Sequence, residues 1–261
     1  MRVLLHRSNM PPAPRTLDPE LLVPLVHPRT LAVGETIALE DQHVRQLAVR
    51  EINVKETFTI VDAAGVNFRA SLTSAREASV FERMRSTTES PARITLVCAV
   101  LARQRMITVV QKATELGCVR VVPVQSVHSV QSADLEKEKP WAWPGQALRA
   151  SRQCRRASVP EVLGVTPLRA ALAADYWKDA TARYMLDDRD GARDPFAAAP
   201  SSGDYVLAVG PEGGWSDAER AQLEKAGAVS LSLGSRVLRA ETAVYSGLTI
   251  LQHRLGDLRP R

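Results

Sequence analysis

The alternation of apolar and polar positions changes character near residue 90. After it, short apolar runs bounded by breakers alternate with stretches whose apolar side chains recur at helical spacing. The runs predict strands over 93–100, 119–124, 161–164, 182–187, 205–209 and 228–233, and the helical spacing predicts helices over 103–116, 141–156, 167–174, 216–226 and 241–255. Such alternation is typical of a mainly parallel sheet with helices on both faces, so we predict an α/β domain over 91–261.

Residues 1–90 follow a different pattern, in which β-forming residues dominate. They predict strands over 36–40, 57–62 and 66–73, a helix over 42–50 and a hairpin turn at 63–65. The first 35 residues are rich in proline and predict irregular structure with a short helix over 18–24. The polar stretch 87–92 predicts a linker, so we expect a small β-rich domain over 1–90.

Two glycine-rich loops follow the predicted strands at 205–209 and 228–233. In the first, Gly210, Gly213 and Gly214 supply backbone that can take positive φ and that lets a ligand approach closely. The second begins at Gly234 and leads into a helix at Glu241. Ligands usually bind at the carboxyl ends of strands in open α/β sheets, so two such loops in succession suggest one pocket, and two ordinary strand-to-helix turns are the alternative.

Composition narrows the classes of function. An apolar share of 45% and a charged share of 24% are typical of a globular domain, and the longest apolar run, 94–102, is too short to span a bilayer. We therefore expect a cytoplasmic protein without a membrane partner. The three cysteines, Cys98, Cys118 and Cys154, are isolated and the five histidines lack ligand spacing, so no metal site is predicted. The common nucleotide-binding glycine motifs are also absent from the sequence.

Positive charge is concentrated in the later part of the chain. Residues 1–90 hold 11 basic and 11 acidic side chains, whereas 91–261 hold 23 basic and 18 acidic ones. Four arginines, Arg149, Arg152, Arg155 and Arg156, are spaced so that three can share one face of a helix. Such a stripe is typical of a surface that binds phosphates, and a solvated helix face is the alternative.

Three motifs occur in order along the chain. They are Gln111-Lys112-Ala113-Thr114-Glu115-Leu116-Gly117, Gly210-Pro211-Glu212-Gly213-Gly214, and the segment from Leu233 to Ala243 that contains Arg236, Leu238, Arg239, Glu241 and Thr242. Together they resemble the RsmE family of 16S ribosomal RNA (uracil-N3) methyltransferases in the SPOUT superfamily. The resemblance covers 93–255 well and 36–90 loosely. It implies a C-terminal deep trefoil knot, an N-terminal PUA-like β-barrel that helps to hold RNA, and a homodimer in which each pocket is completed by the partner.

The resemblance also implies S-adenosyl-L-methionine (SAM) as cofactor, held in the knot largely by backbone groups of three loops. The residues that it assigns to this site are Leu186, Gly210, Glu212, Gly213, Gly214, Leu233, Gly234, Leu238, Arg239 and Ala243. Asp187 and Asp188 would belong to the third loop, which follows the strand at 182–187.

The implied acceptor is N3 of a uridine in the 16S ribosomal RNA of the small subunit, uridine 1498 in the family. That imide nitrogen carries a proton, so removing or polarising the proton is the chemical task of the enzyme. Arg239 would stabilise the developing uracil anion, and Glu241 would orient it or act as base, with Glu212 as the other available carboxylate. For Glu241, a carboxylate favoured by the helix dipole is the alternative.

The implied RNA contacts come from two helices. Gln111 and Lys112 belong to one, where a solvated polar face is the alternative, and Arg149, Arg152 and Arg156 belong to the other. The chain departs from the family pattern at Arg152, Arg155 and His128, which stand where an acid, a glycine and an arginine are usual. We expect these departures to alter either the RNA affinity or the choice of target. Two other classes remain open, a SPOUT-fold RNA-binding protein without methyl transfer and a small-molecule α/β enzyme.

Overall fold

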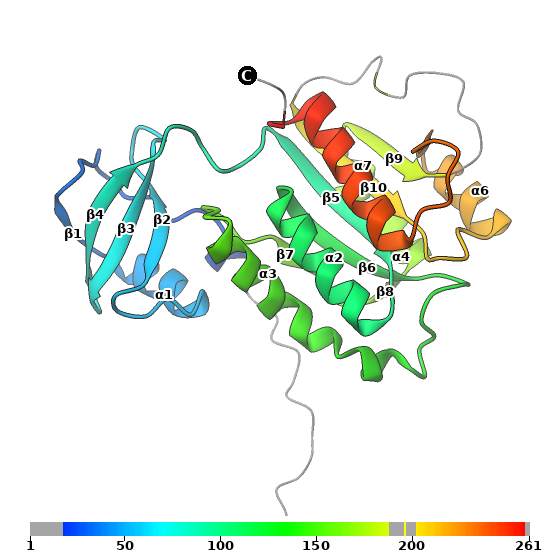
Figure 1. Ribbon diagram of the computed structural model, residues 1–261, viewed down its shortest axis with the longest axis horizontal. Helices are drawn as coiled ribbons and strands as arrows, with labels where there is room; N and C mark the ends of the chain where they lie inside the picture. Colours follow the sequence, from blue (N-terminus) through cyan, green and yellow to red (C-terminus); the bar gives the residue numbers. More distant parts are fainter. Residues whose placement is uncertain (1–17, 188–195, 197–201, 259–261) are drawn as a thin grey trace, which may run out of the picture.

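The computed structural model describes residues 18–187, 196 and 202–258, which form two sheets joined by a connecting segment (Figure 1). We call the part up to the end of the first sheet the amino-terminal region and the part that contains the second sheet the α/β region. Among the described helices, none is long and apolar enough to cross a membrane.

The amino-terminal region is an antiparallel sheet with the strand order β1-β4-β3-β2. Its elements are a 3-10 turn (Pro19–Leu21), β1 (Thr36–Ala38), α1 (Asp41–Val49), β2 (Thr57–Val61), β3 (Asn67–Ser74) and β4 (Glu77–Arg83). The expected turn at Gly65 joins β2 to β3. The short helix expected over 18–24 is confirmed only as the 3-10 turn at Pro19–Leu21, which is shorter than predicted. We had not predicted β4, in which Ala78 and Val80 are buried between charged ends.

The α/β region contains seven strands that pair in parallel, in the order β11-β9-β10-β5-β6-β7 with β8 beside β6. The strands are β5 (Ala92–Ala99), β6 (Cys118–Gln125), β7 (Glu161–Val162), β8 (Thr166–Pro167), β9 (Ala182–Leu186), β10 (Gly203–Val209) and β11 (Val229–Leu231). The predicted mainly parallel α/β architecture is therefore confirmed. The seven-stranded count refers to the part of the chain that the structure describes.

Helices cover both faces of this sheet (Figure 1). They are α2 (Arg103–Glu115), α3 (Trp143–Gln153), α4 (Leu168–Ala173), α5 (Asp175–Lys178), α6 (Asp217–Lys225) and α7 (Ala240–Leu255). Alternate residues of β5 show the two faces, because Leu96 packs into the core with α2, α3 and α7, whereas Val97 packs into the core with α4, α5 and α6. Burying both faces explains why the strands are nearly continuous apolar runs.

Candidate functional site

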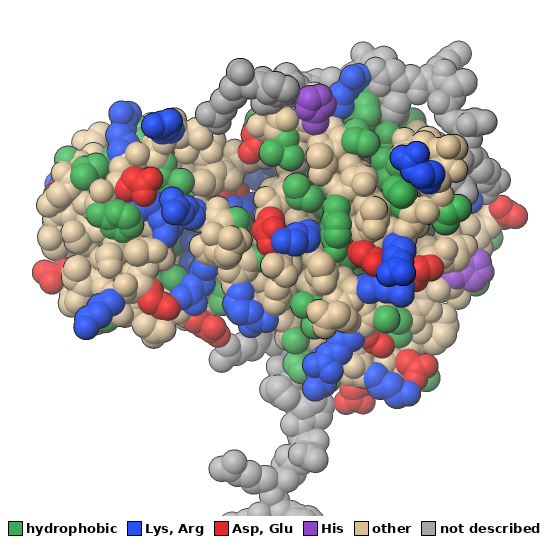
Figure 2. Space-filling model, in the orientation of Figure 1, with side chains coloured by type: hydrophobic (Ala, Val, Ile, Leu, Met, Phe, Trp, Pro, Cys, Tyr) green, Lys and Arg blue, Asp and Glu red, His purple; other side chains and the backbone are tan. Residues whose placement is uncertain are grey.

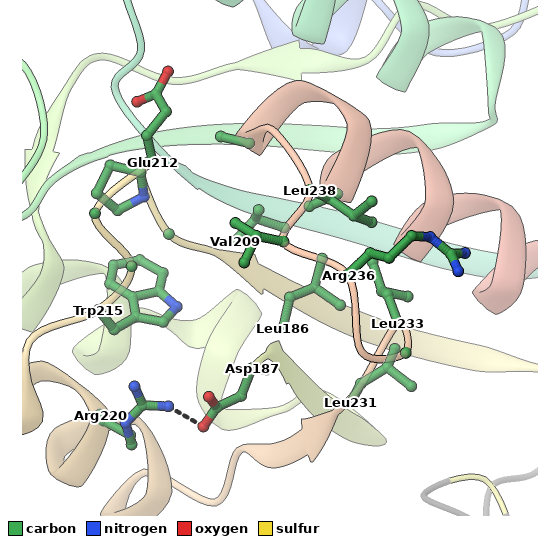
Figure 3. Close-up of a pocket in the computed structure, with 18 residues that line it drawn as sticks. Leu186, Asp187, Val209, Glu212, Trp215, Arg220, Leu231, Leu233, Arg236 and Leu238 are labelled. Atoms are coloured by element: carbon green, nitrogen blue, oxygen red, sulfur yellow. Dashed lines mark ion pairs between the residues drawn. The ribbon is translucent and has the colours of Figure 1, made fainter. Parts of the chain in front are cut away.

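A cavity of about 330 Å³ opens at the carboxyl ends of β9, β10 and β11, beside the start of α7 (Figure 3). This is the edge at which ligands bind in open α/β sheets, and the volume lies in the range of small-molecule sites. Its lining comprises Leu186, Asp187, Val209, Gly210, Pro211, Glu212, Gly213, Gly214, Trp215, Arg220, Leu231, Leu233, Gly234, Arg236, Val237, Leu238, Ala240 and Ala243. The two glycine loops therefore do form one pocket.

The first glycine loop is packed too closely for side chains at two of its glycines. A Cβ added to Gly210 would lie 3.2 Å from the backbone nitrogen of Trp215, and one added to Gly213 would lie 3.0 Å from the Cβ of His128. Gly214 has φ +69°, a conformation that favours glycine. His128 also places its Nδ1 3.2 Å from the Gly214 carbonyl oxygen. The loop is thus held against the segment that follows β6.

The turn from this loop into α6 is fixed by a capping box. The Ser216 hydroxyl accepts from the Glu219 backbone N–H, and the Glu219 carboxylate accepts from the Ser216 backbone N–H at 2.9 Å. The same carboxylate also accepts from the backbone N–H of Val127 at 2.8 Å. The capping box therefore also ties the segment after β6 to the pocket wall.

Nine of the ten residues assigned to the cofactor line the cavity, and Arg239 is the exception. Arg239 is the N-cap residue of α7, and its side chain is exposed outside the lining. Asp188 lies outside the described residues. The cavity lining also contains residues that we had not predicted, among them Trp215, Arg220, Leu231 and Arg236. Trp215 directly follows the glycine motif, which was a usable signal, whereas Arg220 reaches the pocket only through the placement of α6.

Two carboxylates in the lining are paired with arginines. Glu212 forms an ion pair with Arg105 of α2, and both side chains are partly exposed. Asp187 forms an ion pair with Arg220 of α6, and their side chains are only 5% and 15% exposed (Figure 3). Arg105 and Arg220 were not among the predicted site residues. Each comes from a different helix, so only the tertiary structure brings it to the loop.

Glu241 lies in the first turn of α7 and does not line the cavity. Its Oε2 atom is buried and has no hydrogen-bond partner among the described residues, and the same holds for the hydroxyl of Tyr245 one turn later. Burial, and then the charge of Glu241, raise the pKa of Tyr245 to about 12. Tyr245 is therefore protonated at neutral pH and can act only as a neutral phenol there.

The candidate RNA-binding side chains on α2, Gln111 and Lys112, both contact Glu115. Gln111 donates to the Glu115 carboxylate at 3.1 Å, and the Lys112 ammonium lies 2.7 Å from the other oxygen of Glu115. Gln146 of α3 donates to Gln111 at 3.3 Å. This polar cluster leaves Lys112 partly exposed at the helix surface.

The arginines at the end of α3 are placed in three different ways. Arg149 is exposed and donates to Gln146 at 2.8 Å. Arg152 reaches across to the amino-terminal region, where it pairs with Glu56 at 2.6 Å and donates to the carbonyl oxygen of Glu51. Arg155 lies 3.9 Å from Glu82. The predicted shared helix face does not extend this far, because α3 ends at Gln153 and Arg155 takes φ 63°.

Arg156 differs most from the prediction, because it is only 6% exposed. Its guanidinium donates to the carbonyl oxygens of Thr114 and Cys118 and pairs with Glu89 at 2.7 Å. Burial alone would raise the pKa of the Glu89 carboxyl, but the charge and hydrogen bonds of Arg156 outweigh it and hold the pKa below its usual value. Arg156 therefore joins the connecting segment to the α/β region, and its assignment as an RNA contact is corrected.

Other polar contacts complete this junction between the two regions. Arg50 donates to the carbonyl oxygens of Ala157 and Val23, and Thr59 donates to the carbonyl oxygen of Arg155. Burial lowers the pKa of Arg50 to about 10, so it stays charged at neutral pH. Beside the junction runs a groove of about 490 Å³ lined by Lys55, Glu56, Thr57, Arg149, Arg152 and Gln153. Lys and Arg side chains gather along the junction on the face shown in Figure 2.

Known RNA methyltransferases resemble this chain in sequence. A family model described as an RNA methyltransferase domain matches residues 88–252. A ribosomal RNA small subunit methyltransferase E from Aquifex aeolicus is 30% identical over 224 residues, covering 84% of this chain and 95% of that protein. The chain belongs to the ribosomal RNA small subunit methyltransferase E family. Its Mycobacterium tuberculosis member is 30% identical over 215 residues, covering 80% of this chain and 82% of that one.

Solved structures of the methyltransferase E family and related enzymes agree with this placement. The Neisseria gonorrhoeae enzyme, bound to S-adenosyl methionine, has 30% identity and a TM-score of 0.64 and covers 90% of this chain and 99% of its own. A putative methyltransferase from Legionella pneumophila, in complex with SAM, has 28% identity and a TM-score of 0.62, with 90% and 98% covered. The similarity spans both regions of the chain.

Proposed function

We propose that this chain transfers the methyl group of SAM to N3 of a uridine in the 16S ribosomal RNA of the small subunit. The observation that carries the proposal is the cavity between the two glycine loops, in a chain of the methyltransferase E family. Members of this family are named for small-subunit ribosomal RNA, and the Neisseria enzyme was solved with SAM bound.

The pocket residues fit this cofactor. Gly210, Gly213 and Gly214 line the cavity without side chains, so a ligand beside them would meet main-chain groups at close range. Leu186, Leu231 and Leu233 offer apolar contacts to an adenine ring, and the indole N–H of Trp215 is buried without a hydrogen-bond partner among the described residues. Bound SAM supplies an electrophilic methyl group on its sulfonium. We assign the binding of SAM to the nine predicted residues that line the cavity.

The chain's own groups must then activate N3 of the uracil. We assign the stabilisation of the developing anion to Arg239, whose exposed guanidinium at the start of α7 is accessible to an RNA base. Glu241, two residues later and with an unpaired oxygen, would orient Arg239 or accept the N3 proton. Glu212 remains the other carboxylate candidate, although its ion pair with Arg105 lowers its availability as a base.

RNA would bind along the basic groove at the junction of the two regions. Arg149 and Arg152 line this groove together with Lys55, and long-range attraction of phosphates needs only exposed positive charge. Gln111 and Lys112 remain proposed contacts on α2. We assign residues 1–90 to a PUA-like β-barrel domain that binds RNA and 91–261 to a SPOUT domain whose C-terminal part forms a deep trefoil knot.

The proposed working form is a cytoplasmic homodimer. Val237, in the second glycine loop, is 90% exposed although it lines the cavity, and a partner subunit that covers this loop would bury it. A monomer mass at micromolar concentration in sedimentation experiments would contradict the dimer.

The departures from the family pattern do not favour another target. Arg152 pairs with Glu56, Arg155 lies near Glu82, and His128 packs on the first glycine loop. Each replacement thus has an intramolecular contact that accounts for it. Methylation of a different RNA, or RNA binding without transfer, is left as an outcome of the test.

The test incubates the protein with labelled SAM and small ribosomal subunits that lack their natural methylation. Digestion and nucleoside chromatography then identify the product. Label in 3-methyluridine supports the proposal. Label in another nucleoside would keep the methyltransferase and change the target, and binding of SAM without any label would overturn the proposed transfer on this RNA.

A further inference from the structure

The ion pair between Asp187 and Arg220 stands out within the pocket wall. Asp187 directly follows β9 and Arg220 lies on α6, and the pair faces the cavity at the end opposite Glu212 (Figure 3). Their side chains are 5% and 15% exposed, whereas the other charged residues of the lining are more open to solvent. Leu186 and Leu231 adjoin the pair, so two charges are buried at an otherwise apolar edge.

Stability does not explain this arrangement. Replacing a buried ion pair by apolar residues of similar volume is often neutral or stabilising, because the desolvation of two charges offsets their attraction. The pocket wall also contains hydrogen-bond donors that have no acceptor among the described residues. Arg220 Nε and Trp215 Nε1 are buried and have no hydrogen-bond acceptor among the described residues. Unsatisfied donors destabilise a protein unless a ligand or water completes them.

The charge of the pair limits the group that can bind beside it. Because Arg220 neutralises the charge of Asp187, the pair does not favour binding of the ammonium group of the cofactor's amino-acid part. The negative charge of Asp187 likewise disfavours binding of the cofactor's carboxylate. A neutral group that both donates and accepts hydrogen bonds is favoured. The ribose diol is such a group, since its hydroxyls can donate to Asp187 while their oxygens accept from donors such as those of Arg220 and Trp215. Acidic side chains bind ribose hydroxyls in the same way at other nucleotide sites.

We propose that Asp187 binds the ribose diol of the cofactor and that Arg220 is the positioning residue that holds the Asp187 carboxylate in place. This assignment rests on the proposed function, since it requires an adenosine-containing ligand. It deepens that function by naming the residues that distinguish ribose from deoxyribose. Asp187 lies in the third loop that the resemblance implies and Arg220 lies on α6, so neither residue belongs to the two glycine loops.

The test measures binding and needs no turnover. Calorimetry on the full chain would use S-adenosylhomocysteine and its 2′-deoxy and 3′-deoxy analogues. We expect the wild type to lose about tenfold in affinity for at least one deoxy analogue, the size expected for a hydrogen bond to a charged group. Asp187→Asn should weaken binding of the parent ligand about tenfold and reduce the preference for ribose to about twofold or less.

Two further variants separate positioning from folding. Asp187→Asn combined with Arg220→Gln leaves no unpaired buried charge, so it should fold, yet it should still fail to distinguish ribose from deoxyribose. Arg220→Lys should restore part of the preference that Arg220→Gln loses. The matched control is Asp204→Asn, which breaks the exposed ion pair with Arg93 outside the cavity lining and should bind like the wild type.

Three results would overturn the assignment. The first is a double variant that keeps the full ribose preference. The second is an Asp187→Asn variant that loses the preference for S-adenosylhomocysteine over S-inosylhomocysteine but keeps the preference over the deoxy analogues. That result would place the ion pair at the adenine edge. The third is a wild type that does not bind S-adenosylhomocysteine at all, which would overturn the proposed function as well, whereas the first two would leave it standing.

Discussion

The two glycine loops and the arginines after residue 148 were both predicted to touch ligands, and they differ in the structure. All the predicted cofactor residues of the loops except Arg239 line one cavity. The arginines separate into an exposed one, Arg149, one that bridges two regions, Arg152, and a buried one, Arg156. A motif of small residues was thus a better guide to a site than a run of charge.

The reason for this difference is physical. Glycines are needed where the backbone itself bends or is approached closely, and that need depends on neighbours in the sequence, as at Gly214 with its φ of +69°. The role of an arginine depends on which acceptors meet the end of its long side chain. For Arg156 these are Glu89, Thr114 and Cys118, at least 38 residues away in the sequence.

The largest expected effect concerns Arg156. Replacing it by alanine leaves Glu89 without its cation and two carbonyl oxygens without a donor, so the free energy of unfolding should fall by about 3–5 kcal/mol. Urea unfolding followed by circular dichroism measures the change. Arg149→Ala, three residues before Arg152 on an exposed face, is the control and should change stability by less than about 0.5 kcal/mol. Equal effects would mean that Arg156 does not anchor the junction.

A second prediction tests the close packing of the first glycine loop. Gly213→Ala places a Cβ 3.0 Å from the Cβ of His128, so the loop must shift and S-adenosylhomocysteine should bind about tenfold or more weakly, about 1.4 kcal/mol. Gly164→Ala is the control, since nothing lies within 4 Å of its added Cβ. Adding His128→Gly to Gly213→Ala should recover part of the affinity. No recovery would show that the contact with His128 is not the cause.

A third prediction concerns acid and the same junction. The pKa of Glu89 in the folded chain lies below its usual 4.5, so its stabilising effect is present above pH 4.5 and is lost as the pH falls through the lowered value. Thermal unfolding between pH 6 and pH 3 should therefore show a steeper loss for the wild type than for Glu89→Gln, which cannot titrate. Parallel curves would argue against the ion pair with Arg156 as a source of stability.

The smallest expected effect is on RNA affinity. Arg149→Ala should weaken binding of small-subunit RNA modestly and lower the slope of log affinity against log salt by about 1, the loss of one phosphate contact. Arg93→Ala changes the net charge equally but lies outside the groove, where Arg93 pairs with Asp204. Its slope should match that of the wild type. If the two variants behave alike, the groove is not where phosphates bind.

Most of the architecture could be predicted from the sequence, with errors where local signals were weak. The strands of the α/β region are buried on both faces, so their apolar runs stood out from the helices between them. In β4 only Ala78 and Val80 are buried and the ends are charged, which left little pattern to detect. The helix predicted over 141–156 was too long at both ends, since α3 spans Trp143–Gln153.

The sequence by itself determined the α/β class, the two glycine loops at one sheet edge, and the residues of those loops that line the cavity. These depend on periodicity and on backbone conformation, which neighbouring residues set. Only the tertiary structure decided that Arg105 and Arg220 reach the pocket, that Arg156 is buried, and that Arg239 lies outside the lining. Long charged side chains take their role from partners brought near by the fold, and those partners lie far away in the sequence.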